Sequence, residues 1–146
     1  MSRPILMSLN PQWFHLMAAG MKAFEVRKRA PMQKHPYKVY LYCTKHGEDT
    51  YRAGVLWKFE SYKMNGTVCG EFTCVSTTDR TPPWSQNTFG TCLTARDLYD
   101  YAGGANKLSY MEISDFQLYE KPKRLEDFGL KIPPVSWQYI DEEDIK

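Results

Sequence analysis

The ten residues 20–29 read GMKAFEVRKR, in which charged and apolar side chains alternate. In a β-strand successive side chains point to opposite faces, so Phe24 and Val26 lie on one face. The opposite face carries three charged residues: Glu25, Arg27 and Arg29. We therefore expect a strand that packs on a core with one face and presents an ionic binding surface with the other. An amphipathic strand whose charges are simply solvated fits the same spacing.

The residues before this stretch predict a strand and then a helix. Pro4–Leu9 is a short apolar run, which is typical of a buried strand. Asn10 followed by Pro11 predicts a helix start, because asparagine caps free amides and proline fits the first helical position. Gly20 is expected to end that helix, since glycine adopts a positive φ at little cost. The helix therefore ends where the charged strand begins.

Four residues of the charged stretch stand as G-x-K-x-x-E-x-R: Gly20, Lys22, Glu25 and Arg27. This spacing resembles the signature of the ASCH family, small domains of the PUA-like superfold. The resemblance extends to the preceding strand and helix, to a G-E-F strand at Gly70–Phe72 and to the SYMEISD stretch at residues 109–115. It implies an α+β fold, a PUA-like mixed β-barrel of about six strands with two main helices flanking a cleft. It also implies binding of RNA or of modified nucleotides.

Turn signals and alternating patterns predict the remaining elements. We expect strands over residues 37–44, 67–76, 107–119 (broken near 114–115) and 137–140, and a helix over 94–102. That helix has Thr94 as its cap and Asp97 three residues on, close to a capping box. Residues 45–65 are expected to be an insertion relative to the family, with 54–62 forming an extra strand or an ordered loop. Residues 141–146 form an acidic tail that we expect to fray. With 146 residues, the chain is interpreted as a single ASCH/PUA-like domain spanning 1–146.

The charge of the chain is unevenly distributed. The formal net charge is +2, but residues 21–63 hold ten Lys and Arg against four Asp and Glu, and the rest hold nine against thirteen. A basic early half favours a surface that attracts phosphate, although charges scattered over all faces fit the count too. Aromatic residues make up 14% of the chain, which suits packed rings in a barrel and also base stacking.

The cysteines and histidines do not form a metal-ligand pattern. No C-x-x-C pair occurs, and Cys69 and Cys74 are five residues apart, so on one strand they would face opposite ways. We expect no metal and no cofactor. The sequence shows no signal peptide and no apolar run long enough to span a membrane, so we expect a cytoplasmic protein without a membrane partner. The oligomeric state does not follow from the sequence.

Glu71 is the second charged residue of interest. Alternation along residues 67–76 puts Val68, Phe72 and Cys74 on one face. The other face then carries Glu71 beside three uncharged residues: Cys69, Thr73 and Val75. A carboxylate in such surroundings needs a partner or water. We weigh two interpretations: Glu71 lies in the cleft and pairs with Lys22 or Arg27, or it reaches water at the edge of the barrel.

Lys22 is the residue whose place is hardest to predict. It stands where the helix meets the strand, and strict alternation would put it opposite Glu25 and Arg27. It joins them only if the chain turns on entering the strand. If the four residues Lys22, Glu25, Arg27 and Glu71 do converge, two cations and two carboxylates neutralise one another in the empty site. A structural ion network with no function fits the same four residues.

The first functional hypothesis is a binding module for RNA or a small nucleotide or nucleoside. Three basic residues would meet phosphate: Arg27, Lys28 and Arg29. Glu25 or Glu71 would read a base edge, and an aromatic ring, Trp84 or Tyr110, would stack on the base. The motivation is the juxtaposition of charge and aromatic side chains.

The alternative hypotheses come from other classes. Some ASCH proteins are amidohydrolases that act on N4-acetylcytidine-type nucleosides, and the resemblance implies Lys22 and Glu71 as catalytic groups, with Glu25 beside them. Those hydrolases carry threonine at the position of Glu25. A lysine desolvated beside a cation has its pKa lowered and acts as a base or nucleophile. A ribonuclease and a non-catalytic interaction protein with a vestigial cleft are the remaining alternatives.

Overall fold

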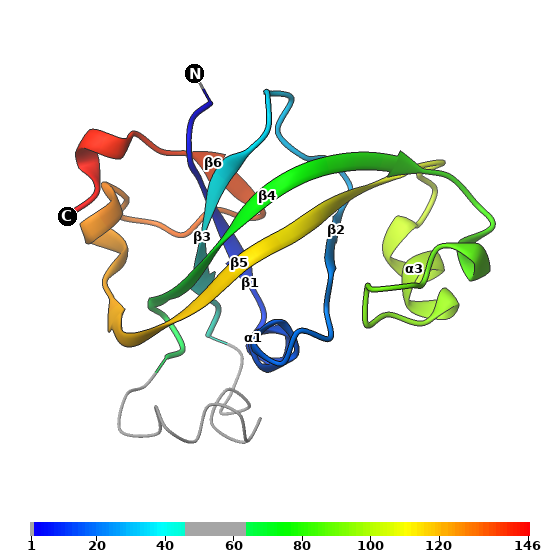
Figure 1. Ribbon diagram of the computed structural model, residues 1–146, viewed down its shortest axis with the longest axis horizontal. Helices are drawn as coiled ribbons and strands as arrows, with labels where there is room; N and C mark the ends of the chain where they lie inside the picture. The colour runs from blue at the N-terminus through cyan, green and yellow to red at the C-terminus, as the bar shows by residue number, and fades with distance from the viewer. Residues whose placement is uncertain (1, 46–63) are drawn as a thin grey trace.

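The computed structural model describes residues 2–45 and 64–146, which form a strongly curved sheet with helices at its ends (Figure 1). The strand order is β2-β5-β4-β3-β1-β6. The six strands are β1 (Ile5–Leu9), β2 (Phe24–Arg27), β3 (Tyr37–Cys43), β4 (Val68–Arg80), β5 (Leu108–Lys123) and β6 (Trp137–Tyr139). β1 and β3 are parallel, and every other pairing is antiparallel. The predicted mixed sheet of about six strands is confirmed, with β2 and β6 at its edges.

The first strand and the helix that follows it place the start of the charged stretch. All five residues of β1 are buried. Helix α1 (Pro11–Ala18) begins with Pro11 in its first turn, and Gly20 follows it with φ +75°. The expected cap is wrong in one detail, because the side chain of Asn10 makes no capping hydrogen bond. Its amide oxygen instead accepts a hydrogen bond from the Thr44 hydroxyl at 3.0 Å, which ties the helix start to the end of β3.

The two longest strands, β4 and β5, pair along most of their length and extend beyond the predicted ends. β5 continues through the expected break: Asp115 has φ +51°, and the register shifts beside it without ending the strand. A second register shift, between Val68 and Gly70, turns Cys69 into the main core with Phe72 and Cys74, whereas Val68 packs into another cluster. The predicted faces of β4 are therefore wrong at its start, because an extra residue in one strand reverses the alternation.

The second main helix, α3 (Ala95–Ala102), begins with the expected capping box. The Thr94 hydroxyl accepts from the Asp97 backbone N–H at 3.0 Å, and the Asp97 carboxylate accepts from the Thr94 N–H at 2.9 Å. The short 3-10 turn η2 (Trp84–Gln86) packs beside it. Both predicted main helices are thus present.

The C-terminal segment packs against the rest of the fold, whereas the sequence analysis expected it to fray. After the turn η3 (Leu125–Phe128) and β6, residues Glu142–Asp144 form the turn η4. The Lys146 N–H donates to the Asp127 carbonyl at 2.8 Å, and Ile145 packs against a buried cluster. The predicted strand or loop at 54–62, and most of the predicted insertion at 45–65, lie outside the described residues. No helix within residues 2–45 and 64–146 is long and apolar enough to cross a membrane.

Candidate functional site

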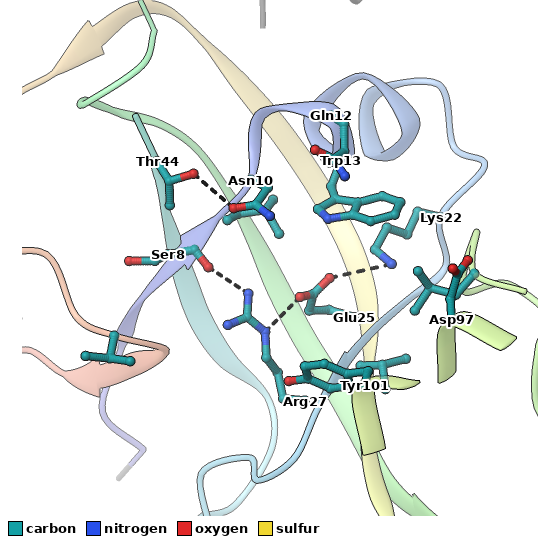
Figure 2. Close-up of a pocket in the computed structure, with 14 residues that line it drawn as sticks. Ser8, Asn10, Gln12, Trp13, Lys22, Glu25, Arg27, Thr44, Asp97 and Tyr101 are labelled. Atoms are coloured by element: carbon teal, nitrogen blue, oxygen red, sulfur yellow. Dashed lines mark hydrogen bonds and ion pairs between the residues drawn. The ribbon is translucent and has the colours of Figure 1, made fainter. Parts of the chain in front are cut away.

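A cavity of about 400 Å³ opens where the ends of β1 and α1 meet β2 and α3. Figure 2 shows Lys22, Glu25 and Arg27 side by side in it, with side chains from both helices around them. Its lining combines charged, hydroxyl and aromatic groups: Ser8, Leu9, Asn10, Gln12, Trp13, Lys22, Glu25, Val26, Arg27, Thr44, Leu93, Asp97, Tyr101 and Val135.

Lys22 enters this cavity because the chain turns before β2. The Lys22 N–H donates to the Leu16 carbonyl, and the Ala23 and Phe24 N–H groups both donate to the Gly90 carbonyl, so the strand begins only at Phe24. The Lys22 ammonium donates to the Thr91 carbonyl at 2.6 Å and lies 3.6 Å from a Glu25 carboxylate oxygen. The turn on which the convergence depends is therefore present.

Glu25 and Arg27 follow the predicted alternation of β2. Val26 and Phe24 pack into the cluster under α3, and the two charged side chains lie on the other face. Arg27 Nε donates to Glu25 Oε2 at 2.8 Å. The other two guanidinium nitrogens donate to the Ser8 carbonyl at 2.7 Å and the Ser136 hydroxyl at 3.1 Å.

This triad, Lys22, Glu25 and Arg27, is nearly removed from solvent. Only 4%, 6% and 9% of the three residues' surfaces are exposed. It carries two cations and one carboxylate, so the triad by itself has a net positive charge. Within the described residues, three of the five N–H groups of Arg27 are engaged. The triad can therefore accept a ligand that brings oxygen acceptors or a negative charge.

Two aromatic rings form the walls. The Lys22 ammonium lies 4.8 Å from the centre of the Trp13 ring, and Tyr101 faces the cavity from α3 (Figure 2). Burial raises the pKa of the Tyr101 phenol, and the nearby Arg27 guanidinium opposes that rise. The exposed Lys28 ammonium lies 5.5 Å from the centre of the Tyr101 ring, so it flanks the cavity.

The likeness of this chain to known proteins is seen in its structure. No protein-family model matches the sequence, and no curated protein matches it. The crystal structure of ASCH from Zymomonas mobilis has 20% identity and a TM-score of 0.73 over 97% of this chain and 90% of that one. A tyrosine-to-phenylalanine mutant of the same protein has 19% identity and a TM-score of 0.74 over 98% and 94%. The chain has the ASCH fold.

A more distant structure extends the comparison. The N-terminal domain of Staphylothermus marinus McrB shares 12% identity and reaches a TM-score of 0.53 over 99% of this chain and 91% of that domain. Identities this low establish the shared fold and leave the ligand of the cavity to be argued from the residues of this chain.

Within the ASCH fold of this chain, Glu71 does not join the triad. Its carboxylate accepts from the Lys38 ammonium at 2.6 Å and from the Tyr119 hydroxyl at 2.9 Å. The predicted pairing with Lys22 or Arg27 is therefore wrong. The reason is the side of the sheet: Glu25 pairs with Met111 of the main core, whereas Glu71, the neighbour of core residue Phe72, projects to the opposite face.

The second carboxylate at the cavity is Asp97 (Figure 2), which sequence analysis assigned only to the helix cap. Hydrogen bonds from the Thr94 backbone and then from its side chain hold the pKa of Asp97 below its ordinary value. The cavity is thus lined by two carboxylates, Glu25 and Asp97, and the second is not the predicted Glu71.

The two aromatic residues predicted to stack on a base are both core residues. Trp84 packs against Leu98, and Tyr110 is fully buried with its hydroxyl donating to the Asn87 carbonyl at 2.9 Å. Neither lines the cavity, so the predicted stacking role does not fit either residue. Trp13 and Tyr101 occupy that place. Sequence analysis missed them because a helical stripe of aromatic residues reads as a core face.

Arg29, the last predicted ligand-binding residue, lies outside the cavity. The Arg29 side chain is exposed and does not line the cavity, and its carbonyl accepts from the Trp137 indole N–H at 3.0 Å. In the part of the chain that the structure describes, no three His, Cys, Asp or Glu side chains gather closely enough to hold a metal ion.

Proposed function

We propose that the cavity binds a nucleotide, either free or within RNA. The observation that carries this proposal is the convergence of Lys22, Glu25 and Arg27 on one cavity between the rings of Trp13 and Tyr101. The volume of about 400 Å³ falls within the range of small-molecule sites. The ASCH fold supports the proposal by analogy, because the family resemblance implies binding of RNA or modified nucleotides.

The polar groups suit the two ends of a nucleotide. Arg27 offers a planar set of donors to phosphate oxygens. Glu25 still has acceptor lone pairs for an exocyclic base amine, because each carboxylate oxygen accepts more than one hydrogen bond. Tyr101 provides a ring face at the mouth of the cavity, on which a base can stack. Lys28 adds a further positive charge beside that ring.

Calorimetric titration with the four 5′-mononucleotides and a short single-stranded RNA, at low and at moderate salt, tests the proposal. We expect saturable binding that weakens as salt rises. Arg27→Ala should weaken it at least tenfold. Arg96→Ala, which removes an exposed arginine paired with Asp100, is the matched control and should bind as the native protein does.

Because Arg27 is buried, Arg27→Ala needs a check that the protein remains folded. Tyr101→Ala provides an independent variant, since Tyr101 lines the cavity and 39% of its surface is exposed. No saturable binding by the native protein, or equal binding by Arg27→Ala and Arg96→Ala, would reject the proposal. Intact RNA after prolonged incubation argues against the ribonuclease alternative.

A second candidate is hydrolysis of the amide of an N4-acetylcytidine-type nucleoside. It is favoured by the 3.6 Å separation of the Lys22 ammonium and the Glu25 carboxylate in a cavity that opens to solvent. Glu25 would take a proton from the attacking water, and Lys22 would stabilise the oxyanion that forms on the carbonyl oxygen. The amide carbon–nitrogen bond then breaks, and the proton passes to the departing amine.

Acetate release from N4-acetylcytidine measures this reaction. The native protein should release acetate, Glu25→Gln and Lys22→Met should not, and Glu71→Gln should remain active because Glu71 lies outside the cavity. Equal, background-level release by the native protein and both cavity variants rejects hydrolysis while leaving nucleotide binding open.

A further inference from the structure

A second cavity, of about 320 Å³, adjoins the first. The two share three lining residues: Ser8, Thr44 and Val135. Its remaining lining consists of Tyr42, Lys45, Pro133 and Pro134. Lys45 is therefore its single charged lining residue within the described chain, so the second cavity is electropositive and rich in hydroxyl groups.

The wall between the cavities is held in place. The Ser8 hydroxyl donates to the Pro134 carbonyl at 2.6 Å, and the Ser8 N–H donates to the Ser136 carbonyl at 2.9 Å. Arg27 binds both Ser8 and Ser136 from the side of the first cavity. Val135, between these anchored residues, has a fully exposed side chain at the shared edge. Its exposure leaves it available to contact a ligand.

Positive charges stand on both sides of this shared edge. Arg27 reaches Ser8 from the first cavity, and Lys45 lines the second. The stem of Lys45 lies across Gly66, where an added Cβ would come within 2.7 Å of Lys45 Cε. The absence of a side chain at Gly66 thus leaves room for the stem of Lys45.

The negative charges lie toward the other end. In Figure 2, Asp97 stands beside Lys22, on the far side of Glu25 from Ser8. The first cavity therefore has a carboxylate-containing end near Lys22 and a cationic end at the shared edge. A base with an amine suits the former, and a phosphate suits the latter.

We propose that the two cavities form one site for two consecutive nucleotides of a single strand. The base of one nucleotide lies between Trp13 and Tyr101, and the bridging phosphate lies at the shared edge between Arg27 and Lys45. The sugar and base of the neighbouring nucleotide occupy the second cavity. This inference rests on the proposed function and specifies its ligand as a strand rather than a lone nucleotide.

Calorimetric titration with 5′-mononucleotides and with the corresponding homodinucleoside monophosphates, at equal salt, tests it. A dinucleoside monophosphate carries one bridging phosphate, so charge alone does not favour it over a mononucleotide. We expect the native protein to bind a dinucleotide at least tenfold more tightly than its mononucleotide. Lys45→Glu should abolish this gain, measured as the ratio of dinucleotide to mononucleotide affinity within the same variant.

Lys34→Glu is the matched control, because Lys34 is also exposed and does not line either cavity. It should keep the gain. Lys45→Ala removes the charge without reversing it, so it should reduce the preference for the dinucleotide without abolishing it. Thermal unfolding checks that each variant is folded.

Three outcomes overturn the inference. Equal affinity for mono- and dinucleotides removes the second subsite but leaves the proposed function standing. Equal losses in Lys45→Glu and Lys34→Glu attribute the gain to general electrostatic attraction. No binding of either ligand removes the proposed function together with the inference.

Discussion

The molecule contains two ionic clusters of similar composition in opposite surroundings. The triad of Lys22, Glu25 and Arg27 is buried at the floor of a cavity. The second cluster, Lys38, Glu71 and Tyr119, spans β3, β4 and β5 outside that cavity. Its side chains meet solvent, with Glu71 16% and Lys38 36% exposed.

The comparison shows that a lysine beside a glutamate does not by itself make a binding site. In the second cluster the carboxylate is satisfied by one cation and one hydroxyl, so the arrangement is electrically balanced. In the triad one carboxylate is shared by two cations, and two rings leave open space above them. Excess charge, burial and an open volume together distinguish the candidate site.

The largest expected difference between the clusters is in stability. Glu25→Gln leaves two buried cations without a counter-charge, and we expect it to lower the free energy of unfolding by about 3 kcal/mol. Glu71→Gln should cost about 1 kcal/mol or less, because solvent screens Lys38. Urea unfolding at neutral pH measures both. Equal losses of unfolding free energy in Glu25→Gln and Glu71→Gln would mean that burial does not distinguish the two clusters.

Ligand affinity should separate the two lysines. Lys22→Met removes a charged donor from the cavity and should weaken mononucleotide binding roughly tenfold to a hundredfold. Lys38→Met removes the same group from the other cluster and should leave binding unchanged. Calorimetric titration of both folded variants gives the comparison. A loss with Lys38→Met, or none with Lys22→Met, would place the ligand elsewhere.

Two tyrosines of α3 line different cavities, so substituting each by alanine gives a matched test of stacking. Tyr101 lines the cavity, whereas Tyr99 lines another hollow beside Pro82 and Pro83. Tyr101→Ala should cost about 1–3 kcal/mol of nucleotide binding through lost stacking, and Tyr101→Phe should retain most of it. Tyr99→Ala should bind as the native protein does. Quenching of tryptophan fluorescence by the ligand provides the readout, and equal affinity in all three variants would remove stacking from the proposal.

The smallest effect concerns alkaline pH and the second cluster alone. The hydrogen bond to Glu71 raises the pKa of Lys38 against the opposing effect of burial, and burial, followed by Glu71, raises that of Tyr119. The folded state therefore retains these protons longer than the unfolded chain. Their contribution to stability is complete below the unfolded pKa values, about 10, and is lost as pH rises through the folded ones.

We therefore expect the free energy of unfolding to fall above about pH 10, and to fall less steeply in Glu71→Gln. Urea midpoints measured at intervals from neutral to alkaline pH test this. The matched substitution Glu25→Gln should leave the alkaline slope closer to native. A steeper fall in Glu71→Gln would contradict the assigned cause.

Much of the framework was predictable because local chemistry decides it. The proline at the start of α1, the positive φ at Gly20 and the capping box at Thr94 each follow from the residue at that position. The alternation in β2 likewise predicted that Glu25 and Arg27 share a face. These features depend on neighbours in sequence, so they are visible in the sequence.

The complete site was not predictable, because it depends on contacts across the fold. Glu71 does lie opposite Phe72 as alternation predicted, but which face of the sheet adjoins the cavity depends on how the strands pair and does not follow from the residue types of β4. Trp13 and Tyr101 come from helices far apart in the chain, and their exposure to one cavity depends on how those helices meet the sheet. Asp97 completes the capping box of α3, and that structural role gave no reason to expect it at a cavity as well.

The register shift at Cys69 has an evolutionary consequence. Because one extra residue of β4 puts Cys69 on the same face as Phe72, loss of a single residue there would exchange the faces of the residues before it while the fold persisted. Two sequences that align without a gap across this point can therefore carry the residues before it on opposite faces of the strand. Alignment by sequence alone is consequently a poor guide to the face that a residue at the start of β4 occupies, unless the strand's bulges are aligned as well.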